Sequence, residues 1–283
     1  MIDLERSNRQ RFGHEAISSH VEGIERIYSE SNIRIGGAHQ LFGLLSDAKD
    51  LAAQWAEGNI RDETDMSKLF NSLHIERIYS GIKLLDGQNN KEKYLKDLLN
   101  GTLDFFHREV SHAKSIFWEL EAFTKIKKVI PNTLLNEPDI VVDIGRYCIA
   151  IPCKKIFSEK GVPKVLSNAV SQIENQHEFG IVAINIDDLI PESVLLKAKT
   201  FQEAGNKLHA QNMDFLKQHE RHFLKYLSAS RIVAVIASTS MVADILDESP
   251  KFNNFSQWAI WTIPGLKSEH QKSIDEFRSK VIG

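Results

Sequence analysis

The sequence predicts an α/β protein with a helical N-terminal region, and three observations lead to this prediction. Apolar residues recur at helical spacing through the first part of the chain, which has no strand-like run. Later runs such as "DIVVDI" and "GIVAINI" are almost wholly apolar, as in strands that are covered on both faces of a sheet. Predicted helices separate these runs, and this alternation indicates the α/β class.

The N-terminal region is expected to be helical throughout. The segments "AISSHVEGIERIYSES", "AHQLFGLLSDAKDLAAQWAEG" and "DMSKLFNSLHIERIYSGIKLL" each have an apolar face at helical spacing. The turn-rich "DGQNN" at residues 86–90 ends the series. We therefore expect a helical N-terminal region over residues 1–90 and an α/β core over residues 91–283.

The core begins with a helical stretch over about residues 92–128, broken near Asn100 and Gly101. A hairpin follows, in which "DIVVDI" and "RYCIAIPC" flank Gly145. The segment "VLSNAVSQIENQHEF" predicts a helix, "GIVAINI" a buried strand, and residues 191–228 a long helix. "RIVAVIAS" and "QWAIWTIPG" predict the last two strands.

The composition is that of an ordinary packed protein, with 42% hydrophobic and 26% charged residues in 283. No segment approaches the ~20 apolar residues of a membrane span, and the charged N-terminus has no signal-peptide core. We expect a cytoplasmic protein without membrane contact. Cys148 and Cys153 lie five positions apart in one predicted strand, so they are expected to be reduced, buried thiols.

An acid and a base come together on one face of the predicted hairpin. Strand alternation places Asp139 on the face opposite its apolar neighbours, and Lys154 on the matching face of the return strand. The start of one strand lies beside the end of the other in an antiparallel hairpin. This pair is either part of an active site or a plain salt bridge on a solvated surface.

The motifs around this pair resemble a known family. "PD" before an apolar strand, a return strand ending in "IPCKK", a helix containing "QIENQ" and the strand "GIVAINI" are similar to the PD-(D/E)XK nuclease superfamily. The resemblance covers about residues 110–190. It implies a restriction-endonuclease-like mixed sheet flanked by helices, and the catalysis of phosphodiester hydrolysis.

The resemblance also implies a metal centre for Mg²⁺ or Mn²⁺. Asp139 and the backbone carbonyl of Cys153 would bind the ion, and Glu119 from the preceding helix would act through metal-bound water. Glu119 is favoured over Glu121 because it falls at the edge of the apolar face of that helix. Lys154 would position the attacking water and offset the charge that develops on the phosphate.

Pro152 departs from the family pattern, which has a second acid at this position. Proline supplies no side-chain oxygen and no N–H group, so it removes one ligand. Glu174 is the nearest candidate for a substitute acid, with Gln172 as a polar companion. The alternative for Glu174 is an exposed carboxylate on a helix surface.

A local excess of basic residues surrounds the motif. Residues 125–164 hold eight Lys and Arg against four Asp and Glu, a net charge of +4. Lys127, Lys128 and Lys155 are therefore expected to contact nucleic acid. A solvated face with scattered lysines is the alternative.

Two functions follow from these observations. We expect a magnesium-dependent endonuclease that acts on DNA, and a role in defence against foreign DNA would suit such a core joined to a helical module. The alternative is a catalytically inactive nuclease-like module that binds nucleic acid or a protein partner. Asp139, Lys154 and Glu119 favour the enzyme, whereas Pro152 favours the inactive module. The N-terminal helices offer a surface for a protein partner or a homodimer.

Overall fold

The computed structural model describes residues 14–57, 66–192, 194–248 and 252–282, which form two compact units. The helical unit holds the described residues up to Phe106 together with Val110–Glu121. The α/β unit holds His107–Glu109 and the described residues from Ala122 onward. This division differs from the boundary expected at residue 90, and it falls within helix α5 (His112–Val129).

The helical unit confirms the three predicted N-terminal helices. A fourth short helix packs with them, because Tyr94 and Leu95 are buried and the hydroxyl of Tyr28 donates to the carbonyl of Leu95 at 2.9 Å. This contact explains why the unit continues past residue 90. The helices are α1 (His14–Glu30), α2 (Gln40–Ala56), α3 (Met66–Lys83) and α4 (Lys91–Asp97).

The α/β unit is built on an open mixed sheet of eight strands in the described part of the chain. β1, β2 and β3 are antiparallel neighbours, and β3 then pairs in parallel with β5. β7 pairs in parallel with β5 and β6 and antiparallel with β8, while β4 continues from β3 and also pairs with β5. The strands are β1 (Thr133–Asn136), β2 (Asp139–Asp143), β3 (Cys148–Ile151), β4 (Cys153–Lys155), β5 (Phe179–Asn185), β6 (Leu196–Ala198), β7 (Ala234–Ile245) and β8 (Phe252–Trp261).

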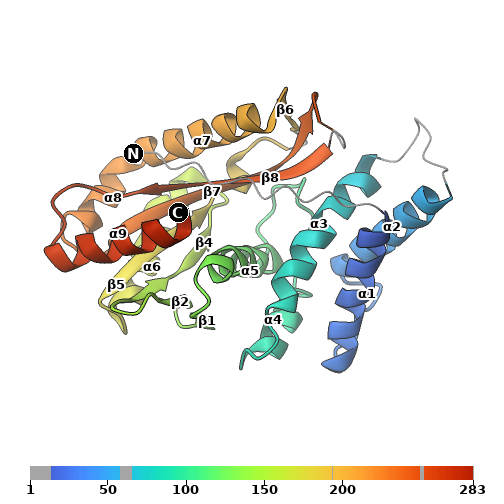
Figure 1. Ribbon diagram of the computed structural model, residues 1–283, viewed down its shortest axis with the longest axis horizontal. Helices are drawn as coiled ribbons and strands as arrows, with labels where there is room; N and C mark the ends of the chain where they lie inside the picture. The colour runs from blue at the N-terminus through green and yellow to red at the C-terminus, as the bar shows by residue number, and fades with distance from the viewer. Residues whose placement is uncertain (1–13, 58–65, 193, 249–251, 283) are drawn as a thin grey trace. The chain divides into compact units, whose positions relative to one another are not determined.

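Helices cover both faces of this sheet (Figure 1). α6, α7 and α8 form an apolar cluster on one face with Val182 and Ile184 of β5. On the other face, His270 of α9 packs on Phe179 with ring centroids 5.2 Å apart, and Lys125 of α5 donates to Ser256 of β8. The helices are α6 (Val162–Glu174), α7 (Phe201–Gln218), α8 (Glu220–Leu227) and α9 (Ser268–Ile282).

Most predicted elements of the core are confirmed. "DIVVDI" and "RYCIAIPC" pair as the antiparallel strands β2 and β3, and Gly145 adopts φ +98° between them, where a side chain would be strained. β5, β7 and β8 contain the three apolar runs, and the chain is helical on both sides of the break near Gly101. The α/β class is therefore correct.

The helix expected over residues 191–228 is wrong in its extent. It begins at Phe201, after Thr200 accepts a hydrogen bond from the N–H of Glu203 as an N-cap, and it breaks at His219. The short strand β6 precedes it and pairs with the end of β7. β1 and α9 were not predicted. Their short or strongly polar sequences give weak periodic signals.

Candidate functional site

The hairpin pair, Asp139 and Lys154, lies at the start of β2 and in the middle of β4. Oδ2 of Asp139 accepts hydrogen bonds from Nζ of Lys154 at 3.0 Å and from the backbone N–H of Cys153 at 2.6 Å. The two side chains are only 17% and 20% exposed. The structure thus brings together the acid and the base that strand alternation places on one face.

The environment of Asp139 changes its acidity. Burial raises the pKa of the Asp139 carboxyl above its ordinary value, while the charge of Lys154 and the hydrogen bonds from Lys154 and Cys153 act against this rise. The carboxylate is therefore a stronger base than an exposed aspartate, and a charged lysine is in contact with it. Such a pair can hold a phosphate near the ammonium or accept a proton.

Pro152 lies between β3 and β4, where the family pattern has an acid. Its carbonyl accepts a hydrogen bond from the N–H of Ala183 at 3.0 Å, which links β4 to β5. The proline therefore serves the sheet through its backbone and adds no side-chain oxygen beside Lys154.

Glu174, the candidate for a substitute acid, lies elsewhere in the α/β unit. Glu174 forms an ion pair with Arg231, which precedes the amino end of β7, whereas Lys154 pairs with Ile184 near the carboxyl end of β5. Because these are opposite ends of parallel strands, Glu174 does not join the hairpin pair. Gln172 is half-buried, and its Oε1 has no hydrogen-bond partner among the described residues.

The expected magnesium site is not supported by the side chains near Lys154. Glu119 is half-buried on the part of α5 that belongs to the helical unit, and its role in a site stays a prediction. Across the described residues, no three His, Cys, Asp or Glu side chains form a group that could hold a metal ion. Asp139 is the carboxylate that pairs with Lys154, and a single carboxylate does not supply the several oxygen ligands that Mg²⁺ requires.

Two of the three lysines expected to contact nucleic acid are engaged within the protein. Lys127 donates to the carbonyls of Pro131 and Thr133, at 3.2 and 2.8 Å, just after the end of α5. Lys128 is exposed. The side chain of Lys155 is only 5% exposed and pairs with Asp188, and its contact with nucleic acid stays a prediction.

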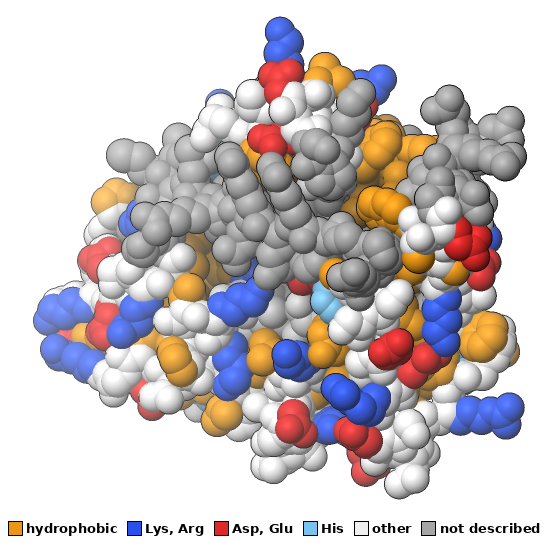
Figure 2. Space-filling model, turned by 45° about the vertical axis from the view of Figure 1, so that its right-hand side comes forward, with side chains coloured by type: hydrophobic (Ala, Val, Ile, Leu, Met, Phe, Trp, Pro, Cys, Tyr) orange, Lys and Arg blue, Asp and Glu red, His pale blue; other side chains and the backbone are white. Residues whose placement is uncertain are grey.

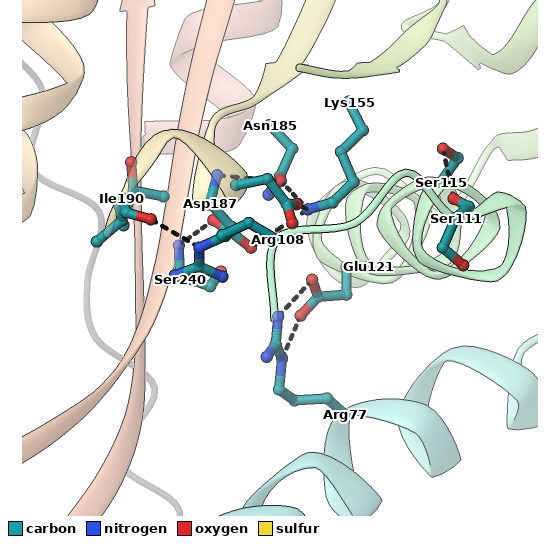
Figure 3. Close-up of polar contacts among 12 residues, drawn as sticks. Arg77, Arg108, Ser111, Ser115, Glu121, Lys155, Asn185, Asp187, Ile190 and Ser240 are labelled. Carbon is teal, nitrogen blue, oxygen red and sulfur yellow. Dashed lines mark hydrogen bonds and ion pairs between the residues drawn. The ribbon is translucent and has the colours of Figure 1, made fainter. Parts of the chain in front are cut away.

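Lys155 belongs to a polar group that we name the lysine centre: Lys155, Asn185, Asp187 and Asp188. Its Nζ lies 2.5 Å from Oδ1 of Asn185, 2.6 Å from Oδ2 of Asp188 and 3.9 Å from Oδ2 of Asp187 (Figure 3). The carboxyl ends of β4 and β5 bring these residues together, because Lys155 and Asn185 are direct partners in the ladder. Successive strand residues point to opposite faces, so this centre and the hairpin pair lie on different faces of the sheet.

Sequence reasoning missed the acids of the lysine centre. The signal was present in "INIDD", where polar residues directly follow a buried strand. A neighbouring segment is also held at this end of the sheet. Arg108 donates from Nε to the carbonyl of Ile190 at 2.6 Å and from its backbone N–H to Glu192 at 2.8 Å (Figure 3).

The surface drawn in Figure 2 carries charges of both signs. Among the residues coloured there, Lys and Arg side chains are interspersed with Asp and Glu side chains.

In the described part of the chain, no helix has the length and apolar character that crossing a membrane requires. Comparison of the chain with protein-family models, with curated proteins and with solved structures finds no match.

Proposed function

We propose that the α/β unit is a nuclease-like module that binds the phosphate backbone of DNA at the hairpin pair and does not cleave it through a metal ion. The order of elements supports the likeness to nucleases. A helix, an antiparallel three-strand meander, a helix and a parallel central strand follow one another as α5, β1 to β3, α6 and β5. In the proposed likeness Asp139, at the start of β2, and Lys154, in β4, would take the motif positions.

The observation that carries the proposal is the geometry of Lys154. Its ammonium has three N–H donors, and Asp139 accepts one of them at 3.0 Å. The side chain is 20% exposed, and we propose that its other donors bind a phosphate oxygen that approaches from solvent. Asp139 holds the ammonium in place, which reduces the side-chain entropy lost on binding.

We propose no metal-dependent cleavage because the residues near Lys154 offer few ligands for a metal ion. Pro152 supplies no carboxylate, its carbonyl is bonded to Ala183, and Glu174 is paired with Arg231 at the other end of the strands. Of these three positions only Asp139 offers a carboxylate beside Lys154, whereas Mg²⁺ prefers several oxygen ligands.

DNA binding is tested by fluorescence anisotropy with a labelled duplex across a range of salt concentrations. Lys154→Ala should weaken binding and lower the slope of log K against log salt by ~0.9, as expected for one lost phosphate contact. Lys280→Ala is the matched control, because it removes the same charge from an exposed position near the end of α9. Equal affinities of the wild type and Lys154→Ala would contradict phosphate binding at the hairpin pair.

Cleavage of plasmid DNA with Mg²⁺ or Mn²⁺ tests the second part of the proposal. We expect no cleavage by the wild type, and metal affinity gained by Pro152→Glu, which returns a carboxylate to the face of Lys154. Wild-type cleavage that Lys154→Ala abolishes would instead support the catalytic nuclease.

A further inference from the structure

The ring of His270 is buried where α9 meets the start of the central strand β5. Only 6% of this residue is exposed, and its ring packs on that of Phe179 with 5.2 Å between the centroids. Phe179 in turn meets the ring of Tyr147, the residue before β3, edge to face. Nδ1 of His270 is buried and has no hydrogen-bond partner among the described residues. The histidine thus adds a ring to an aromatic contact between the helix and the sheet.

Two further contacts hold α9 in place. Ile274 and Phe277 are completely buried, so the apolar face of the helix is covered. Near the start of the helix, Oε2 of Glu269 accepts hydrogen bonds from the hydroxyl of Tyr147 at 2.7 Å and from Nη2 of Arg146 at 3.1 Å. Arg146 and Glu269 are 63% and 44% exposed, so water weakens this ion pair. The docking of α9 therefore depends mainly on its buried side chains.

Charged groups from three segments act on the ring of His270. Burial lowers the pKa of His270 below its ordinary value, and the charge of Lys267, just before α9, lowers it further. The charge of Glu178, just before β5, and a hydrogen bond to the backbone of Ser230 act in the opposite direction. The ring is therefore uncharged at neutral pH. A proton added to Nδ1 would bury a positive charge, together with an N–H donor that has no acceptor among the described residues.

We propose that protonation of His270 releases α9 from the start of β5, which makes this contact a switch that responds to acid. The released helix uncovers the ring of Phe179 and the side chains of Ile274 and Phe277. Because the released ring regains its ordinary pKa of 6.5, release becomes more favourable as the pH falls from this value to the lowered pKa of the docked ring. The inference does not depend on the proposed function, because Phe179 begins β5 whereas Lys154 lies beside the other end of that strand.

Hydrogen exchange followed by mass spectrometry tests the proposal between about pH 8 and about pH 5, with rates corrected for the pH dependence of exchange itself. In the wild type the protection of the α9 amides should fall by up to ~10-fold per pH unit below 6.5, the limit for one proton, while that of β5 and β7 is unchanged. Glu269 stays ionised in this window, because hydrogen bonds from Tyr147 and Lys272 hold its pKa below the ordinary value.

Two variants assign the response to the imidazole. His270→Phe keeps a ring on Phe179 but cannot take up a proton, so its α9 should stay protected at every pH. His270→Gln also cannot be protonated, and its protection should be lower than that of the wild type at neutral pH but independent of pH. His222→Phe is the control, because it removes a half-buried histidine of α8 and should leave the wild-type response intact.

Three results would overturn the proposal. The first is an α9 that keeps its protection in acid in the wild type. The second is an equal loss of protection in the wild type and in a variant of His270 that cannot be protonated. The third is a loss of protection in β5 and β7 together with α9, because acid would then unfold the whole unit and not release one helix.

Discussion

The guanidinium of Arg77 on α3 meets the carboxylate of Glu121 on α5 through two hydrogen bonds of 2.6 Å, one from Nε and one from Nη2 (Figure 3). The same guanidinium lies over the ring of Phe117, with 4.9 Å between Cζ and the ring centroid. Both side chains of the ion pair are largely buried. The pair therefore joins two helices of the helical unit through a geometry that only a planar fork can make.

Arg77→Lys should destabilise the helical unit although it preserves the charge. A lysine ammonium cannot donate to both carboxylate oxygens in this arrangement, and we expect a loss of about 1–3 kcal/mol in the free energy of unfolding. Urea unfolding followed by circular dichroism measures this loss. Arg26→Lys is the control, because Arg26 is 68% exposed and lies 3.9 Å from Glu30; it should change stability by less than ~0.5 kcal/mol. Equal effects of the two substitutions would contradict the importance of the fork.

The hairpin pair should give stability a defined dependence on pH. Because the pKa of Asp139 is raised on folding, the folded state holds this proton more tightly than the unfolded state. The stability that this proton adds to the folded state is fully present below the ordinary pKa of 3.8. It is lost as the pH rises through the pKa of Asp139 in the folded state. The stability of the wild type relative to Asp139→Asn should therefore fall with rising pH across this window. Urea titrations at several pH values test this, and a difference that grows in favour of the wild type would contradict it.

The close approach of α6 to β5 should make Gly180 intolerant of a side chain. A Cβ at this position would lie 2.5 Å from Cδ1 of Ile173, so Gly180→Ala should cost about 1–3 kcal/mol through overpacking. Gly43→Ala is the matched control, because Gly43 lies in α2 with no atom within 4 Å of its added Cβ. It should stabilise the protein slightly through helix propensity. Chemical denaturation compares the two, and an unchanged midpoint for Gly180→Ala would contradict the packing argument.

The two thiols should react at different rates in the folded protein. The sequence suggested that both are buried, but Cys148 is exposed and only Cys153 is buried. A thiol-specific reagent should therefore modify one cysteine per chain before unfolding, with Cys148 identified by mass spectrometry. Partial desolvation of the thiol and the charge of Asp143 raise the pKa of Cys148, so this reaction should accelerate as the pH rises above neutral. Labelling of Cys153 first would contradict the prediction.

The hairpin and the apolar strands could be predicted from the sequence because their patterns are local. Gly145 and the alternation of residues around it are enough to predict β2 and β3. The different environments of the Lys154 and Lys155 side chains depend instead on contacts between distant segments. Only the pairing of β4 with β5 and the turn after Asn185 show that one lysine faces Asp139 and its neighbour is enclosed. The expectation that Glu174 joins the hairpin pair failed for the same reason, because its ion-pair partner Arg231 lies far along the chain.

The pairing of β7 has a consequence for how the α/β unit opens. Its first half is bonded to β5 and its end to β6, while β8 is bonded along nearly the whole of its other edge. Backbone amides in the segment from Val235 to Ser238 can meet deuterated water only when β5 or β8 separates from β7. Their hydrogen-exchange rates should consequently report the global unfolding of the unit rather than local fraying. Measuring them would therefore show how cooperatively the unit unfolds.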